Sequence, residues 1–465
     1  MLKQYDDSGG LDVLDDESSS GAMNNIICVS FPLPEARSRL LDDLSGTYDF
    51  PVALEPCTQD VANDTIAALH WAQDSSETIE RHLCRYGALL LRGFPIRTPQ
   101  DFAHLTEALG WPNFGYEASG GNAVRRNVVG DRVFTANESP PDKVIPFHHE
   151  LAQTARYPHR VAFFCENPAM RGGATPLLDS GNAYARLRSE FPEGLAELQK
   201  KGVRYTRVMT VDDRPHSAIG RGWADTFGVS TPQELEAKLA SSGDKLEWLG
   251  VSLSPLGVDG DRYPVRHYTD VRPAVLVDPS DPERRPRFFN QILAAHTGWR
   301  DELNAPGASV VLGDGTPMRQ DMLDAMERIF LEESVSVQWR AGDVMLINNL
   351  QVMHARETFV DGEAPRRVLA SLGRDPAPVM EERMANVHGE HGVGSNKAHK
   401  YAWQATGGER RTRGPPALRE SKTRAKVIRG NPGIAAGRAA ARGPSRASAS
   451  LRAFVARPPA VLFAR

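Results

Sequence analysis

Two His-x-Glu pairs are the residues whose types and spacing could do metal chemistry. His148 and Glu150 stand in "IPFHHELAQ", and His388 and Glu390 stand in "VHGEHGVG". Residues i and i+2 of a strand share a face, so such a pair offers an imidazole and a carboxylate to one point in space. A histidine from a distant strand would complete the two-histidine, one-carboxylate triad that holds non-haem iron(II) and leaves positions open on the metal.

This spacing is weak evidence alone, because a chain with 13 histidines and 59 acidic residues contains about 1.6 such pairs by chance. The pair at His388 lies in a Gly-rich stretch without strand alternation, which favours a coincidence in a loop. The first pair fits a metal site, or a half-buried strand histidine that a carboxylate satisfies. In a strand, His148 shares the face of Glu150 and His149 points to the opposite side. We assign no acid or base role to His149 or His159.

The elements that must position these residues are indicated by turn and periodicity signals. The apolar run "GALLLRGF", residues 87–94, is typical of a buried strand. The next segment predicts a helix, with Thr98 as N-cap, Pro99 at the first helical position and Gly110 at its end. A strand and a helix are therefore expected in direct succession.

The same Thr-Pro opening occurs twice more. At Thr231 and Pro232 it is followed by Glu234, which completes a capping box. At Thr316 and Pro317 it precedes "MRQDMLDAMERIFLEE". Both positions are predicted helix starts.

Three strand-like segments follow within a short stretch of chain. They are "SVSVQW" (334–339), "DVMLINN" (343–349) and "RRVLASLG" (366–373). Short turn-like links join them, which favours an antiparallel sheet over a Rossmann alternation.

The composition is that of a globular protein with two unusual ends. Hydrophobic residues make up 40% and charged residues 25%, and the net charge of -4 gives no chain-wide attraction to nucleic acid or acidic membranes. A chain of 465 residues is longer than a single hydrophobic core usually organises, so its length indicates one large domain with appendages, or two domains. We expect disorder in the acidic segment 1–25 and in the basic, low-complexity tail 384–465, with the folded domain over residues 26–383.

Apolar stretches and cysteine spacing bear on where the protein resides. No stretch approaches the roughly 20 apolar residues of a membrane span, and the N-terminus is acidic where a signal peptide is basic and then apolar. The widely spaced cysteines form no Cys-x-x-Cys pair; they are Cys28, Cys57, Cys84 and Cys165. We therefore expect reduced thiols and a cytoplasmic protein.

Several separate blocks of the sequence resemble the taurine/2-oxoglutarate dioxygenase (TauD/TfdA-like) superfamily, especially its clavaminate synthase-like branch. The blocks are "VFTANESPPDKVIPFHHELAQTARYPHRVAFFCENPAMRGGATPLLDS", "IGRGWADTF", "FFNQILAAHTGW" and "AGDVMLINNLQVMHARETFVDGEAPRRVLASLG". The likeness runs from about Gly87 to Asp375 and keeps the order of the blocks. It implies an α+β fold with a double-stranded β-helix (jelly-roll) core and flanking helices. It also makes residues 26–383 an Fe(II)/2-oxoglutarate dioxygenase-like catalytic domain.

The resemblance also implies the ligands of the metal and of the cofactor. The family's His-x-Asp/Glu pair and distal histidine match His148, Glu150 and His354, which would bind Fe(II) and carry catalysis. The co-substrate 2-oxoglutarate would chelate the iron, and a threonine and an arginine would hold its far carboxylate. An arginine suits this task because its planar fork pairs two oxygens at once. The threonine matches Thr175.

The arginine is Arg366 or Arg367, since both lie at the family's usual distance past the distal histidine. Strand parity places the two on opposite faces and leaves the choice open. Aligning the strand on its closing Gly-Arg-Asp favours Arg367, with Arg366 as the alternative. Taurine-type members carry a second arginine four positions on to hold a sulfonate. That position is Ser371 here, so a sulfonate substrate is unsupported.

The reaction implied is oxidation, most simply hydroxylation, of a C–H bond of a small organic molecule by O2, with succinate and carbon dioxide as co-products. Halogenating members replace the carboxylate ligand by a small residue, so Glu150 argues against halogenation. The loop "TANESPP", Thr135–Pro141, is a candidate wall of the substrate site. Hydroxylation against desaturation, the substrate and the oligomeric state stay open.

Two other classes of function are compatible with the sequence. In the first, a zinc- or manganese-dependent hydrolase or isomerase uses the same triad without 2-oxoglutarate, and Thr175 with Arg367 argues against it. In the second, the barrel is an idle scaffold and the basic tail binds nucleic acid or membrane by charge. The tail after Gly407 lacks the interleaved aromatic residues of a base-stacking surface. We expect neither nucleic acid nor membrane as a partner of the folded core.

Overall fold

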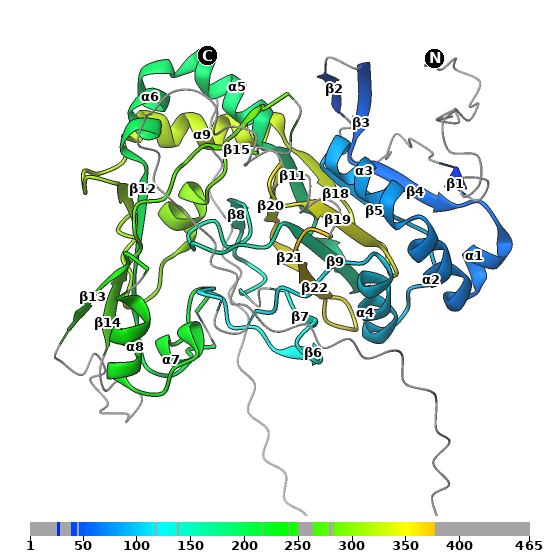
Figure 1. Ribbon diagram of the computed structural model, residues 1–465, viewed down its shortest axis with the longest axis horizontal. Coiled ribbons are helices and arrows are strands. Elements are labelled where there is room, and N and C mark those ends of the chain that lie inside the picture. The colour runs from blue at the N-terminus through cyan, green and yellow to red at the C-terminus, as the bar shows by residue number, and fades with distance from the viewer. Residues whose placement is uncertain are drawn as a thin grey trace, which may run out of the picture. The chain divides into compact units, whose positions relative to one another are not determined.

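The computed structural model describes residues 26–27, 39–43 and 46–376, apart from residues 117–118, 137–138, 216, 241, 250–263, 279–280 and 282. All of these belong to one of the two units into which contacts divide the chain, Met1–Gly394 (Figure 1). The predicted acidic segment, the predicted basic tail and the second pair, His388 and Glu390, lie outside the described residues.

Helices and strands are mixed along the described chain, as predicted for an α+β fold. The largest element is an eight-stranded sheet in which only β4 and β5 pair in parallel among the described strands. The apolar run at 87–94 forms the buried strand β5 of this sheet, which confirms that prediction. In spatial order the strands are β1 (Ile26–Ile27), β4 (Val52–Pro56), β5 (Ala88–Leu91), β19 (Val344–Asn348), β9 (Arg160–Asn167), β22 (Arg367–Gly373), β7 (Val133–Thr135) and β6 (Asn127–Val129).

A four-stranded antiparallel sheet packs against the large one. In spatial order its strands are β18 (Val335–Val337), β11 (Thr175–Asp179), β20 (Val352–Arg356) and β8 (Ile145–His148). Both sheets contribute to the apolar core between them, for example Phe163 and Val368 from the large sheet and Leu177 and Val337 from the small one. Side chains alternate between the two faces of a strand. The apolar side chains on the outer face of each sheet must therefore be buried by another layer.

N-terminal helices cover the outer face of the large sheet (Figure 1). Phe102 of α4 stacks on Phe164 of β9, with ring centroids 5.4 Å apart. The start of α4 confirms the predicted N-cap, because the Thr98 side chain accepts a hydrogen bond from the Asp101 amide. The helices of this layer are α1 (Gln59–Asn63), α2 (Thr65–Asp74), α3 (Ser76–Tyr86) and α4 (Pro99–Ala108).

A second helical layer covers the outer face of the small sheet. Phe147 of β8 meets Phe330 of α9 edge-on, with ring centroids 6.0 Å apart, and Met353 of β20 belongs to the same core. The elements of this layer are α5 (Ser180–Glu190), α6 (Pro192–Lys201), α9 (Gln320–Glu333) and a π-helical turn, Ala294–Gly298. Each sheet is therefore apolar on both faces, as burial between layers requires.

A further sheet and short ladders complete the described fold. Helix α8 begins at the predicted capping box of Thr231 and Glu234. This part comprises β13 (Lys245–Trp248), β14 (Val265–Tyr268), β12 (Val203–Met209) and β17 (Val310–Leu312), with helices α7 (Trp223–Phe227) and α8 (Pro232–Leu239). The two-stranded ladders are β10 (Arg171–Gly172) with β21 (Phe359–Val360), β15 (Leu276–Val277) with β16 (Pro286–Arg287), and β2 (Arg39–Asp43) with β3 (Gly46–Phe50).

Two predictions about elements need correction. Thr316 does not start α9, which begins at Gln320; the Thr316 hydroxyl donates to Asp314, and Pro317 forms an isolated bridge with Val311. The three predicted strand segments form β18, β19 and β22, but these strands do not pair with one another, and β20 and β21 lie between the second and the third along the chain. The chain passes between the two sheets after each strand, so β18 lies in the small sheet and β9 separates β19 from β22.

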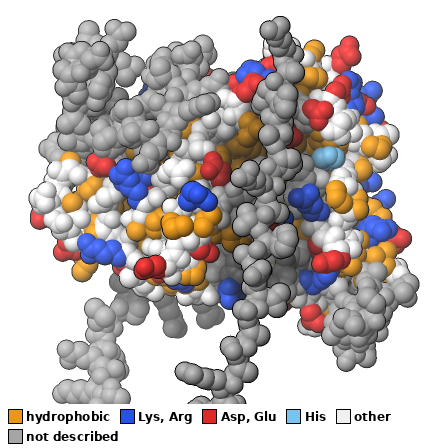
Figure 2. Space-filling model, turned by 180° about the vertical axis from the view of Figure 1, so that it is seen from behind, with side chains coloured by type: hydrophobic (Ala, Val, Ile, Leu, Met, Phe, Trp, Pro, Cys, Tyr) orange, Lys and Arg blue, Asp and Glu red, His pale blue; other side chains and the backbone are white. Residues whose placement is uncertain are grey.

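The described helices, cysteines and surface give little information about where the protein resides. No described helix is both long and apolar enough to cross a membrane. The three described cysteines, Cys57, Cys84 and Cys165, are free thiols, whereas Cys28 lies outside the described residues. Figure 2 shows basic, acidic and apolar side chains intermingled on the described part of one face.

Candidate metal centre

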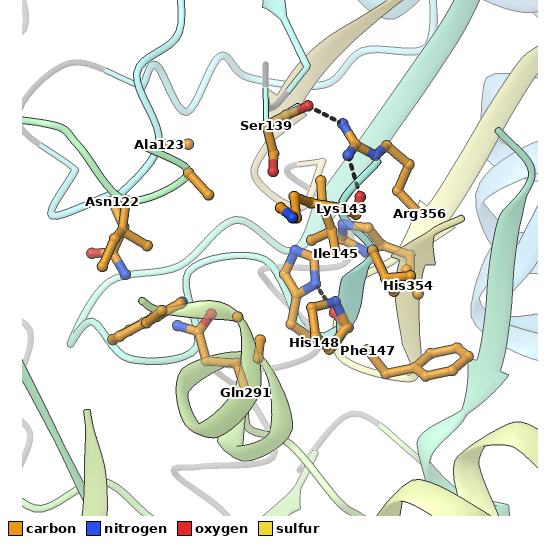
Figure 3. A pocket seen from close by; sticks show the side chains of 18 of the residues that line it. Asn122, Ala123, Ser139, Lys143, Ile145, Phe147, His148, Gln291, His354 and Arg356 are labelled. Carbon is orange, nitrogen blue, oxygen red and sulfur yellow. Dashed lines mark hydrogen bonds between the residues drawn. The ribbon is translucent and has the colours of Figure 1, made fainter. Parts of the chain in front are cut away.

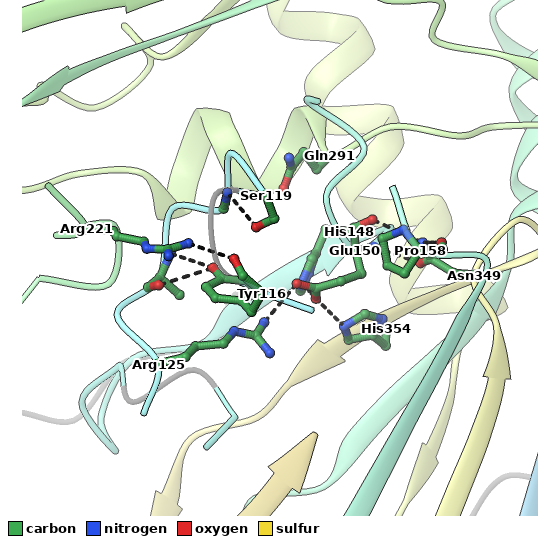
Figure 4. A network of polar contacts seen from close by, with 12 residues as sticks. Tyr116, Ser119, Arg125, His148, Glu150, Pro158, Arg221, Gln291, Asn349 and His354 are labelled. Atoms are coloured by element: carbon green, nitrogen blue, oxygen red, sulfur yellow. Dashed lines mark hydrogen bonds and ion pairs between the residues drawn. The ribbon is translucent and has the colours of Figure 1, made fainter. Parts of the chain in front are cut away.

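The small sheet and the turn after β8 bring the three predicted ligand residues together (Figure 4). His148 is the last residue of β8 and the direct cross-strand partner of His354 in β20. Directly opposed residues on neighbouring strands have Cβ atoms about 4.5–5.5 Å apart, and these two imidazole centroids lie 4.4 Å apart. The ligand atoms of His148, Glu150 and His354 all lie within 4.8 Å of one another.

Glu150 reaches the histidines from a turn and not from the strand itself. β8 ends at His148, and Leu151 after the glutamate has a φ of 59°. Asn349 holds this turn: its side-chain oxygen accepts from the Glu150 amide at 2.8 Å, and its side-chain NH2 donates to the Glu150 carbonyl at 3.0 Å. The expected strand alternation is thus replaced by a strand end and a fixed turn.

The hydrogen bond of His148 and the pKa values of His354 and Glu150 are compatible with metal binding. The Nδ1 atom of His148 lies 2.8 Å from the Pro146 carbonyl oxygen, so donation there leaves Nε2 as a free acceptor. Burial lowers the pKa of His354 to about 4, which keeps the imidazole neutral at pH 7. Burial by itself would raise the pKa of Glu150, but the charge of the adjacent Arg125 guanidinium holds it well below its usual value. Two imidazoles and one carboxylate are the donor set that non-haem Fe(II) takes.

His149 points away from this centre. Its ring is fully buried against Phe289, with centroids 4.5 Å apart, and its Nδ1 lies 2.6 Å from the Asn349 carbonyl oxygen. Burial lowers the pKa of His149 to about 3. His159 lies elsewhere, with its Nδ1 2.6 Å from a carboxylate oxygen of Asp375. Neither ring faces the three ligand atoms.

Arg125 belongs to the site, and sequence reasoning missed it. Its Nη2 atom lies 2.8 Å from Oε1 of Glu150, and both side chains are buried. The guanidinium carbon lies 4.6 Å from the ring centroid of Tyr116 and 5.2 Å from that of Phe134. No motif spacing marks this arginine, because only the folded chain brings its segment to the glutamate.

The ligand atoms open into a cavity of about 1310 Å³ (Figure 3). Thr175 lies in its wall, with its hydroxyl accepting a hydrogen bond from Trp339 Nε1 at 2.9 Å. The described part of the predicted wall loop Thr135–Pro141 also lines the cavity, through Ala136, Ser139 and Pro140. The three predicted ligand residues, Thr175 and the described part of the wall loop therefore line the same cavity.

Arg366 and Arg367 face opposite ways, as strand parity requires. Arg367 is exposed and pairs with Glu166. Arg366 lines the cavity together with Val368, the next residue on its face, and donates to the Gly173 carbonyl at 3.1 Å. Burial lowers the pKa of Arg366. The structure thus places the alternative residue beside the cavity and the favoured Arg367 outside it.

Arg356 ties the wall loop to the strand that carries His354 (Figure 3). Its guanidinium donates to the carbonyls of Ser139 at 2.7 Å, Pro140 at 2.8 Å and Lys143 at 2.5 Å. Burial lowers the pKa of Arg356 to about 10, so the group is still charged at neutral pH. Sequence reasoning missed this role as well, although Arg356 stands two positions after a predicted ligand.

Together these features define a class of protein: a metal site of the two-histidine, one-carboxylate type, carried by two packed sheets beside a large cavity. Residues 53–372 match a family described as "Taurine catabolism dioxygenase TauD, TfdA family". The chain belongs to this family. It is accordingly an oxidoreductase, an oxygenase whose cofactors are Fe(II) and 2-oxoglutarate.

The chain is also similar to individual proteins, to different degrees. A clavaminate synthase-like protein of Arabidopsis thaliana is 37% identical over 355 residues, which cover 75% of this chain and 99% of the relative. The dapdiamide synthesis protein DdaC of Enterobacter agglomerans is 25% identical over 311 residues, 63% of this chain and 84% of the relative. The crystal structure of PvcB from Pseudomonas aeruginosa aligns with a TM-score of 0.39 at 15% identity, covering 74% of this chain and 93% of that one.

Proposed function

We propose that the chain hydroxylates a C–H bond of a small organic molecule, and that its two packed sheets are the double-stranded β-helix of the family. The observation that carries the proposal is the shared cavity: the three ligand residues, Thr175 and Arg366 all line it. His148, Glu150 and His354 would hold Fe(II) through two nitrogens and one oxygen. Three of the six positions usual for Fe(II) would then stay open.

We further propose Arg366, and not Arg367, as the group that holds the far carboxylate of 2-oxoglutarate beside Thr175. Arg366 is largely buried, and no described carboxylate forms an ion pair with it. A buried charge is costly unless it is paired, so an incoming carboxylate would offset that cost. Arg367 already has Glu166 as a partner on the opposite face.

Bound iron and 2-oxoglutarate supply the oxidising power, with succinate and carbon dioxide as the products of the co-substrate. The protein supplies position and protection. The two imidazoles of His148 and His354 and the carboxylate of Glu150 would hold one side of the metal. Arg356 holds the loop at Ser139–Lys143 against the cavity, where it would shield the reacting centre from bulk water.

The cavity supports a second organic molecule beside the co-substrate. Pockets for one drug-sized ligand occupy roughly 300–1,000 Å³, and this cavity measures about 1310 Å³. Apolar and charged side chains both line it, which suits a substrate with both kinds of group. A relative named for dapdiamide synthesis also supports a small-molecule substrate.

Anaerobic titration tests the proposal. Fe(II) and 2-oxoglutarate added together to the wild-type protein should produce the weak visible charge-transfer band of the chelate, and His148→Ala should not show it. Admission of O2 should then yield succinate. If the wild-type protein shows no band with both present, the proposed cofactor arrangement is wrong. A non-redox metal enzyme would bind metal but form no succinate from O2 and 2-oxoglutarate.

A further inference from the structure

The two oxygens of Glu150 face different partners (Figure 4). Oε2 lies 3.8 Å from Nε2 of His148 and 3.6 Å from Nε2 of His354, whereas Oε1 lies 2.8 Å from Nη2 of Arg125. We propose that Arg125 is a positioning residue that restricts Glu150 to binding the metal through one oxygen, Oε2. This inference rests on the proposed function and concerns the same site.

The contact is built to hold. The side chains of Arg125 and Glu150 are only 7% and 5% exposed, so their charges interact with little screening by water. The guanidinium lies over the Tyr116 ring, and the Tyr116 hydroxyl is itself fixed between the amide and carbonyl of Ala123, at 3.2 and 3.1 Å. Arg125 therefore keeps its place through packing as well as charge.

The backbone next to Arg125 is anchored from a different part of the fold. Arg207 of β12 donates from Nη1 to the Asn122 carbonyl at 3.1 Å, and the Arg221 amide donates to the same carbonyl at 3.1 Å. Arg221 also donates from Nη1 to the Tyr116 carbonyl at 3.1 Å. The segment is thus held from outside the metal site, and the reach of Arg125 to Oε1 is set before any ligand binds.

Coordination numbers give the consequence. A carboxylate can bind a metal through one oxygen or through both. With two histidines and one oxygen bound, an Fe(II) site of this type has three positions left, two for a chelating keto acid and one for O2. A second bond from Oε1 would occupy one of the three. The ion pair with Arg125 keeps that oxygen engaged, so loss of Arg125 should weaken 2-oxoglutarate binding more than metal binding.

The test measures the two affinities separately. Arg125→Gln, Arg125→Lys and the wild type are titrated anaerobically with Fe(II) alone and then with 2-oxoglutarate, while the charge-transfer band and the melting temperature are recorded. Arg126→Gln is the matched control, because Arg126 is the exposed neighbour of Arg125. For Arg125→Gln we expect the Kd for Fe(II) to stay within about threefold and the Kd for 2-oxoglutarate to rise about tenfold. The position of the band should also change, and Arg125→Lys should restore part of the affinity.

The alternatives give different results. If Arg125→Gln binds 2-oxoglutarate as tightly as the wild type, Arg125 does not control the coordination of Glu150. If it loses Fe(II), 2-oxoglutarate and thermal stability together, Arg125 is a packing residue and the inference is overturned. A wild-type protein without any band contradicts the proposed function instead, whatever the variants do.

Discussion

At the scale of single residues, the two adjacent histidines have different expected roles. We expect His148 to bind the metal and His149 to serve packing only. His148→Ala removes one of the three proposed metal donors and should weaken Fe(II) binding by more than about 100-fold, since even the outer partners of metal ligands contribute about 10- to 100-fold. His149→Ala should keep the metal but lower the free energy of unfolding by about 1–3 kcal/mol, because a buried hydrogen bond to Asn349 is lost. Metal titration and chemical denaturation check the two effects. Equal loss of iron from both variants would contradict the assigned geometry.

The arginine pair offers a second comparison within one strand. Arg366→Ala should weaken 2-oxoglutarate binding by roughly 30-fold or more, because truncating one partner of a buried charge pair costs about 2–5 kcal/mol. Arg367→Ala removes an exposed partner of Glu166 and should change that affinity less than about twofold. Calorimetric titration of the iron-loaded proteins measures both. The reverse order of effects would restore Arg367 as the cofactor residue.

The sequence predicted the residues of the triad, Thr175 and part of the wall loop, but not Arg125 or the role of Arg356. His148, Glu150 and His354 are tied to a motif, whereas Arg125 reaches Glu150 only because its segment is anchored by distant arginines. Parity alone could not choose between Arg366 and the next residue. Pairing with β9 and the packing of Val368 in the core between the sheets decide which side chains of β22 point toward the cavity.

At the scale of elements, Arg356 should act on the wall loop and not on the metal. Arg356→Lys replaces a fork that reaches three carbonyls by a single point of donation. We expect faster hydrogen exchange of the backbone amides of Ser139, Asp142 and Lys143, with unchanged affinity for Fe(II). Arg367→Lys, at an exposed position, is the control. Unchanged exchange in the loop would show that other contacts hold it.

Local signals located most elements, and long-range pairing decided where they went. Thr98 and Thr231 cap their helices as expected, because a capping box needs only neighbouring residues. Thr316 failed as a cap because its segment pairs with Val311 before the helix begins. The three predicted strand segments are β18, β19 and β22, but their neighbours in the sheets come from segments far away in sequence, which periodicity cannot reveal.

At the scale of the whole molecule, the C-terminal limit of the folded domain can be tested by truncation. A chain that ends at residue 383 should keep its melting temperature and its charge-transfer band, since the metal site and both sheets are retained. A chain that ends at Arg374 loses Asp375, a fully buried partner of Arg160 and His159. Removing one partner of a buried ion pair costs about 3–5 kcal/mol, so this shorter chain should melt at a clearly lower temperature. A matching loss in the longer chain would place the boundary beyond residue 383.

The cross-strand pairing of His148 and His354 bears on the stability of one edge of the small sheet. Among the described strands, β8 pairs with β20 alone and forms the edge of the small sheet. A metal bound by both His148 and His354 would cross-link this edge strand, β8, to its neighbour β20. Newly made chains without iron would present a looser edge, open to proteases and to pairing with other chains. Bound iron would then stabilise this edge of the small sheet as well as supply the chemistry of the site.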